Sequence, residues 1–171
     1  MLSCIDSRSS VEIIFDLGLG DVFTIRIAGN VARNKFLGSI GYGCKVAGAK
    51  LILVMGHTRC GAVTTAVDLD LTGRDVNEAT GCDHLDLIVH DIQKSIGLSE
   101  KLAFANASVD QRRAIVDQVA RKNVIRSVQL IAQESATISR LLEEGKTAIV
   151  GAMYDVVTGD IEFLTENAIG L

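Results

Sequence analysis

The stretch of this sequence that most constrains its fold is the apolar run Leu-Ile-Leu-Val-Met at residues 51–55. An apolar run without polar alternation is typical of a strand buried on both faces of a parallel sheet. Other strand-like segments begin near Met1, Val22 and Thr147, and amphipathic or small-residue segments between them predict helices. Strands that alternate with helices predict an α/β fold, with a mainly parallel central sheet of four to five strands flanked by helices.

The expected strands cover residues 1–5, 22–28, 50–56 and 147–154, and 161–164 returns as a hairpin partner after a turn at 158–160. The expected helices cover residues 11–17, 36–49, 60–67, 85–96 and 109–143, the last with a break near Lys122 and Asn123. The polar, glycine-containing stretch at 68–83 predicts a loop.

Length and charge narrow the class of protein. The 171 residues predict one domain over 1–171, and a formal charge of −4 offers no basic surface for nucleic acid or an anionic membrane. The apolar runs are too short to span a bilayer, so we expect no membrane segment in this chain. Four cysteines without a secretory signal predict reduced thiols and a cytoplasmic location.

Unusual side chains gather where three of the expected strands end. The segments are Cys4 to Arg8, Arg26 to Asn30 and Gly56 to Gly61. In open parallel sheets, ligands bind outside the carboxyl ends of the strands, so we expect these segments to meet in one crevice.

His57 and Cys60 form an H-x-x-C pair at a strand-to-helix turn, and Cys4 supplies a second thiolate from a neighbouring strand. Two sulfurs and one imidazole are a ligand set of catalytic zinc with an open fourth position, and soft thiolates favour zinc over Mg²⁺ or Ca²⁺. We therefore predict one zinc ion held by these three residues. Cys44 and Cys82 are expected not to be ligands.

Asp6 and Arg8 follow Cys4 at two-residue spacing. If the segment is extended, their side chains share one face, and Arg8 can clamp Asp6 in a bidentate ion pair. Asp6 then either accepts a hydrogen bond beside the metal or becomes a conditional fourth ligand, and the sequence leaves both roles open. Arg26, within an apolar strand, requires a carboxylate or a bound anion as its partner.

The three motifs together resemble the β-class carbonic anhydrases. Cys-x-Asp-x-Arg, Arg-x-x-x-Asn and Gly-His-Thr-x-Cys-Gly occur in the family's order, strongly over residues 4–66 and more weakly over 149–163. The resemblance implies zinc at Cys4, His57 and Cys60, with Asp6 and Arg8 as the catalytic dyad. It also implies a substrate pocket formed by Phe23, Ala28, Tyr42 and the backbone N–H of Gly61.

The implied reaction is the zinc-dependent, reversible hydration of CO2 to bicarbonate and a proton. The family forms homodimers or larger homo-oligomers, in which Phe23 and Tyr42 are candidates to line the partner's pocket. Two alternatives stay open: hydrolysis of carbon disulfide or carbonyl sulfide at the same zinc site, and a non-catalytic zinc-binding regulatory domain. Many members carry helices before the first zinc cysteine. We expect this chain to lack them, and fusion to a membrane transporter is a further hypothesis.

Overall fold

The computed structural model describes residues 1–105 and 107–171, and within them five strands form one sheet in the order β2-β1-β3-β4-β5. The strands are β1 (Leu2–Ser3), β2 (Ile25–Arg26), β3 (Leu51–His57), β4 (Ala148–Tyr154) and β5 (Ile161–Ile169). The first four pair in parallel, and β5 runs antiparallel to β4. The predicted α/β class and mainly parallel sheet are confirmed.

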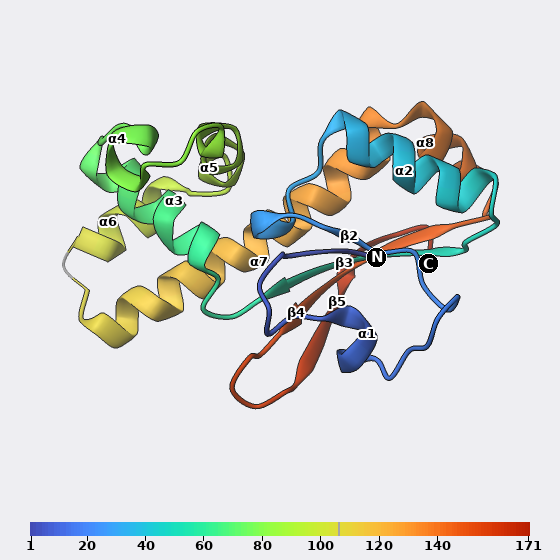
Figure 1. Ribbon diagram of the computed structural model, residues 1–171, viewed down its shortest axis with the longest axis horizontal. Helices are drawn as coiled ribbons and strands as arrows, with labels where there is room; N and C mark the ends of the chain where they lie inside the picture. Colours follow the sequence, from blue (N-terminus) through green and yellow to red (C-terminus); the bar gives the residue numbers. More distant parts are fainter. Residues whose placement is uncertain (106) are drawn as a thin grey trace.

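Helices cover the sheet and extend beyond one end of it (Figure 1). They are α1 (Val11–Ile14), the 3-10 turn η1 (Ala28–Asn30), α2 (Asn34–Lys45), α3 (Gly61–Thr72), α4 (Val76–Thr80), α5 (Leu85–Gln93), α6 (Leu98–Ala105), α7 (Val109–Glu134) and α8 (Ala136–Glu143). Figure 1 shows α3 to α6 grouped together, with α2 and α8 side by side at the other end of α7.

Strand β3 is buried on both faces, as its apolar run predicts. Ile52 and Val54 belong to the larger core, which includes residues of α7. Leu53 and Met55 belong to a smaller core on the other face, where Val11 of α1 packs. The side chains alternate because successive residues of a strand point to opposite faces.

Helix α7 lies close to the sheet because two glycines face it. A Cβ atom on Gly56 of β3 would lie 2.6 Å from Cγ2 of Val124, and one on Gly151 of β4 would lie 2.8 Å from Cγ1 of the same valine. Carbon atoms in favourable contact are about 3.5–4.0 Å apart, so a side chain at either glycine would displace the helix.

Several expected boundaries are wrong. The helical region 109–143 breaks at Ser135, where the backbone is extended and the serine side chain caps α8, and it continues through Lys122 and Asn123. Asn123 is tolerated because its side chain donates to the carbonyl oxygen of Gly29, 2.6 Å away, which supplies a buried polar group with a partner.

The expected loop at 68–83 is also wrong in part. Helix α3 continues to Thr72 and ends at Gly73, which adopts the left-handed conformation common at helix C-termini. A second short helix, α4, follows with its N-terminus capped by Asp75. Helix α6 was not predicted, and β1 and β2 are shorter than the expected strands.

Candidate metal centre and active site

Three buried side chains meet at the carboxyl ends of the parallel strands. Cys4 follows β1, His57 is the last residue of β3, and Cys60 precedes the first turn of α3. Ser3 pairs with Met55, so the register brings Cys4 alongside the end of β3. The ligand atoms of Cys4, His57 and Cys60 all lie within 4.8 Å of one another. Within residues 1–105 and 107–171, this is the only such group of three or more His, Cys, Asp or Glu side chains.

The hydrogen bonds of His57 leave one ring nitrogen available. Nδ1 lies 2.9 Å from the carbonyl oxygen of Thr58, which fixes the tautomer with Nδ1–H as donor. Nε2 is buried and has no hydrogen-bond partner among the described residues. A neutral imidazole whose second nitrogen donates to a carbonyl is the usual form of a metal-binding histidine.

The two sulfur atoms are spaced as a zinc site requires. Sγ of Cys4 lies 3.9 Å from Sγ of Cys60. Zinc–sulfur bonds of about 2.3 Å at tetrahedral angles separate two sulfurs by about 3.8 Å. This spacing, together with the available nitrogen of His57, fits zinc, with Cys4, His57 and Cys60 as its ligands.

A hydrogen bond between the two sulfur atoms shifts the pKa values of Cys4 and Cys60 in opposite directions. The hydrogen bond with Cys60 lowers the pKa of Cys4 against the opposing effect of burial, with further lowering by His57. The same hydrogen bond, and then burial, raises the pKa of Cys60, whereas the backbone N–H groups of Val63 and Ala62 lower it. Those N–H groups belong to the first turn of α3, where the helix dipole favours a thiolate. One thiolate is therefore already stabilised, and a bound cation would stabilise the second.

Asp6 and Arg8 form the expected bidentate ion pair beside these ligands. Nε of Arg8 donates to Oδ1 of Asp6 at 2.9 Å, and Nη2 donates to Oδ2 at 2.7 Å. These bonds hold the pKa of Asp6 well below its usual range. Oδ2 also lies 3.9 Å from Nε2 of His57, so the carboxylate borders the metal ligands.

The geometry that produces this pair differs from the expected extended segment. Ser7 and Arg8 form a turn, and the backbone N–H of Arg8 donates to Oδ1 of Asp6 at 2.9 Å. Buried Ser9 donates to the carbonyl oxygen of Asp6 at 2.9 Å. The ion pair is thus built into a tight turn and not into an extended strand.

Arg26 finds its partners in this same segment. Its guanidinium donates to the carbonyl oxygen of Cys4 at 2.9 Å and to that of Asp6 at 2.6 Å. The prediction of a carboxylate or bound anion is wrong, because two backbone carbonyls serve instead. Arg26 therefore anchors the backbone that carries both Cys4 and Asp6.

The implied pocket residues divide between the two ends of the sheet. Ala28 begins η1, directly after β2, and Gly61 begins α3, directly after Cys60, so both lie at the metal end. Phe23 precedes β2, whose Ile25 pairs with Leu2. Cys4 lies two residues beyond Leu2, whereas Phe23 lies two residues before Ile25. About four residues, or roughly 13 Å, therefore separate Phe23 from Cys4 along the sheet.

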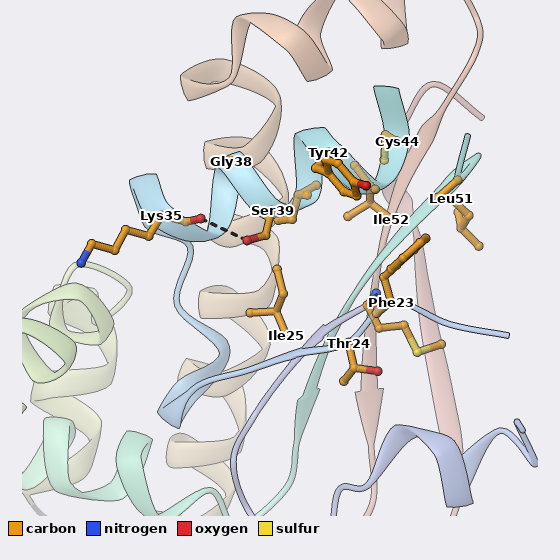
Figure 2. A pocket seen from close by; sticks show the side chains of 14 residues that line it. Phe23, Thr24, Ile25, Lys35, Gly38, Ser39, Tyr42, Cys44, Leu51 and Ile52 are labelled. Atoms are coloured by element: carbon orange, nitrogen blue, oxygen red, sulfur yellow. Dashed lines mark hydrogen bonds between the residues drawn. The ribbon is translucent and has the colours of Figure 1, made fainter. Parts of the chain in front are cut away.

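Phe23 and Tyr42 line a cavity of about 530 Å³ at the amino ends of β2 and β3 (Figure 2). Figure 2 shows Tyr42 and Ser39 reaching into it from α2, and Leu51 and Ile52 from the start of β3. Phe23 is 56% and Tyr42 61% exposed. Within this chain the cavity is separate from the metal ligands, and both aromatic rings are accessible to a neighbouring subunit.

The remaining cysteines lie away from the metal ligands. Cys44 is buried in α2, with its sulfur 3.9 Å from Oγ1 of Thr147, and Cys82 is exposed. Sequence reasoning missed one contact at the site. Asp117 of α7 accepts a hydrogen bond from the backbone N–H of Arg59, which lies between His57 and Cys60. No local spacing signals this contact, because 58 residues separate the two.

The fold and this constellation define an α/β protein with a candidate two-cysteine, one-histidine metal site at the carboxyl edge of a parallel sheet. The sequence profile of the family described as "Carbonic anhydrase" matches residues 1–161. The carbonic anhydrase of Mycolicibacterium smegmatis is 36% identical over 162 residues, covering 95% of this chain and 72% of that protein. Carbonic anhydrase 2 of Mycobacterium tuberculosis H37Rv is 34% identical over 163 residues, covering 93% and 70%.

Solved structures show the same fold. A tetrameric β-carbonic anhydrase from Sordaria macrospora superimposes with a TM-score of 0.78 at 22% identity, covering 95% of this chain and 78% of that one. The β-carbonic anhydrase CafA of Aspergillus fumigatus gives a TM-score of 0.75 at 27% identity, covering 95% and 73%. The chain belongs to the β-class carbonic anhydrase family. Among the described helices, none combines the length and apolar character needed to cross a membrane.

Proposed function

We propose that this chain is a zinc enzyme that catalyses the reversible hydration of CO2 to bicarbonate and a proton. One observation carries the proposal. The unpartnered Nε2 of buried His57 faces the sulfurs of Cys4 and Cys60, and an ionised carboxylate, that of Asp6, lies 3.9 Å away. Family membership supports the same reaction.

Asp6 and Arg8 have different roles beside the metal site. Zinc, when bound, supplies Lewis-acid chemistry that makes water a nucleophile at neutral pH. Asp6 accepts a hydrogen bond from the attacking water at Oδ2 and so directs its lone pair toward CO2. Because Arg8 holds the pKa of Asp6 low, the carboxylate stays ionised and orients the water without keeping its proton.

The positions of Gly61 and of the apolar residues around Cys4 suggest two further contributions to the reaction. The backbone N–H of Gly61, at the start of α3, donates to an oxygen of the substrate, where the helix N-terminus favours developing negative charge. The buried apolar residues around Cys4 limit the number of competing water molecules. The proton released by the reaction passes to solvent through the partly exposed side of the dyad, where Arg8 is 48% exposed.

We further propose that the chain acts as a homodimer or larger homo-oligomer. Phe23 lies roughly 13 Å from Cys4 along the sheet. Tyr42 lines the same cavity as Phe23, which includes none of the three proposed ligands, and both rings are exposed. A second subunit packed against the cavity lined by Phe23 and Tyr42 would cover both rings. The two rings would then border the substrate pocket of that second subunit. The tetrameric relative from Sordaria macrospora supports this assembly. Reduced metal-binding cysteines fit a cytoplasmic location, which we also propose.

Stopped-flow measurement of CO2 hydration tests the reaction, using protein whose zinc content has been measured. We expect one zinc per chain and hydration well above the buffer rate. Turnover of carbon disulfide or carbonyl sulfide without CO2 hydration would identify a hydrolase. One zinc per chain without turnover of any of the three would indicate a non-catalytic zinc-binding domain and would refute the proposed enzyme.

A further inference from the structure

The loop between the second and third metal ligands is held from both sides. Arg59 lies between His57 and Cys60 and adopts a φ of +56°, in the left-handed region that residues other than glycine seldom adopt. Its carbonyl oxygen accepts a hydrogen bond from Nη2 of Arg8 at 3.2 Å. Its backbone N–H donates to Oδ1 of Asp117 at 2.7 Å.

Thr58, the neighbouring residue, is fixed by a different part of the sheet. Its backbone N–H donates to the carbonyl oxygen of Tyr154 at 2.9 Å, and its hydroxyl accepts from the N–H of Val156 at 3.1 Å. The turn after β4 therefore secures the first half of the loop. The second half, where the backbone turns toward Cys60, is bonded by Asp117 at the N–H of Arg59 and by Arg8 at its carbonyl oxygen.

Asp117 has no ion-pair partner within 4 Å among the described residues, although it is partly buried on α7. A partly buried carboxylate needs a compensating hydrogen bond, because burial disfavours its charge. The N–H of Arg59 is the donor that the structure supplies. The carboxylate is therefore directed at the loop and not at a neighbouring cation.

We propose that Asp117 is a positioning residue of the metal centre. By fixing the left-handed peptide of Arg59 it sets the direction in which Cys60 approaches His57, and it holds the carbonyl to which Arg8 donates. Asp117 thus connects α7 to both the ligand loop and the Asp6–Arg8 pair. This inference rests on the proposed function, since it concerns the same metal site, but its tests do not depend on turnover.

The first test is hydrogen exchange at the Arg59 amide, followed by NMR in the wild-type chain. A bonded amide exchanges slowly, and we expect protection of Arg59 in the wild type and in Asp117→Asn, whose amide oxygen can still accept. In Asp117→Ala we expect exchange at least ~10-fold faster. Rapid exchange in the wild type would overturn the proposal without any variant.

The second test is the rate at which a chelator removes zinc from the loaded protein. Loss of a residue that orients a metal ligand typically weakens metal binding about 10- to 100-fold. We therefore expect zinc release at least ~10-fold faster in Asp117→Ala and close to the wild-type rate in Asp117→Asn. Equal release from all three proteins would refute the positioning role.

Asp68→Ala is a matched control, because Asp68 and Asp117 line the same cavity of about 440 Å³ beside α3 and α7. Among the hydrogen bonds of the described residues, the side chain of Asp68 makes none to the loop. Its variant removes a carboxylate from the cavity and is expected to match the wild type in both tests. Faster zinc release in Asp68→Ala as well would assign the effect to cavity charge and contradict the role of Asp117. If the variants show these differences in amide exchange and zinc release but the wild type does not hydrate CO2, only the proposed function is contradicted.

Discussion

The guanidinium of Arg8 holds the carboxylate of Asp6 through two parallel hydrogen bonds, Nε to Oδ1 at 2.9 Å and Nη2 to Oδ2 at 2.7 Å. A carboxylate with both oxygens engaged in this way is fixed in direction and stays ionised. It is therefore placed to orient a water molecule beside the metal ligands, while remaining outside the ligand group of Cys4, His57 and Cys60.

Replacing Asp6 tests whether it orients water or holds the metal. We expect Asp6→Asn to lower kcat for CO2 hydration about 100-fold, in the range attributed to positioned acid–base groups, and to keep one zinc per chain. Stopped-flow kinetics and zinc analysis on the same preparation measure both quantities. Loss of zinc from Asp6→Asn would instead make Asp6 an obligatory ligand.

Replacing Tyr42 tests the proposed assembly. A charged residue at an interface is costly to bury, so Tyr42→Glu is expected to shift the chain toward the monomer while leaving its zinc content unchanged. Sedimentation velocity measures the change. Leu19→Glu is a suitable control, because Leu19 is fully exposed and is not among the residues that line the cavity. A wild-type chain that is monomeric at all concentrations would contradict the assembly.

Glu100 provides a pH test of how α6 is attached to α7. It is 8% exposed and accepts a hydrogen bond from Nζ of Lys122 at 2.6 Å, and this bond lowers the pKa of Glu100. A lowered folded-state pKa means that the stabilisation is complete above the unfolded pKa of about 4.3 and is lost as the pH falls through the folded value.

We therefore expect Glu100→Gln to lower the free energy of unfolding by about 1.5–3 kcal/mol near pH 7, the range for hydrogen bonds to charged groups. The difference from the wild type should narrow below about pH 4. Urea unfolding of both proteins from pH 7 to below about pH 4 measures this difference in the free energy of unfolding. Glu166→Gln, at an exposed position on β5, serves as the control. A difference that grows toward acid pH would be the wrong sign for this ion pair.

The close approach of α7 to the sheet predicts a coupled pair of substitutions. Gly151→Ala places a methyl group 2.8 Å from Cγ1 of Val124, and overpacking of this kind typically costs about 1–3 kcal/mol. Val124→Ala removes the clashing methyl groups, so the double variant is expected to be less destabilised than the sum of the two single variants. Thermal or urea unfolding of all four proteins measures the coupling. Simple additivity would show that the cost of Gly151→Ala does not arise from contact with Val124 and would contradict this prediction.

The sequence predicted the site best where side chains that can bind a metal lie at the ends of strands. The clustering of Cys4, His57 and Cys60 could be predicted because these residues lie at or just beyond the ends of two recognisable strands, and parallel strands bring such residues to one edge. The lengths of β1 and β2 were overestimated because β-branched residues lie beyond the paired positions, Ile5 after β1, Val22 and Thr24 before β2 and Ile27 after it. The break at Ser135 was missed because a serine within a helical pattern acts as a cap only when the backbone turns there.

The contacts that Arg26 and Asp117 make around the site could not be predicted from the sequence, for a different reason. Arg26 binds backbone carbonyls, which have no signature in the side-chain sequence. Asp117 is one of 21 acidic residues, and its contact with Arg59 depends on how α7 crosses the sheet. That crossing is set by the two glycines that face Val124, so it emerges only from the packed fold.

X-ray absorption spectroscopy of the zinc-loaded chain tests the central claim most directly, namely that Cys4, His57 and Cys60 hold zinc. The predicted first shell has two sulfurs at about 2.3 Å and two nitrogen or oxygen neighbours at about 2.0–2.1 Å. The exposed Cys82 gives the control variant Cys82→Ser, which should leave this shell unchanged, whereas Cys60→Ser should lose a sulfur or the metal. A wild-type shell without two sulfurs, or an unaltered shell in Cys60→Ser, would contradict the account.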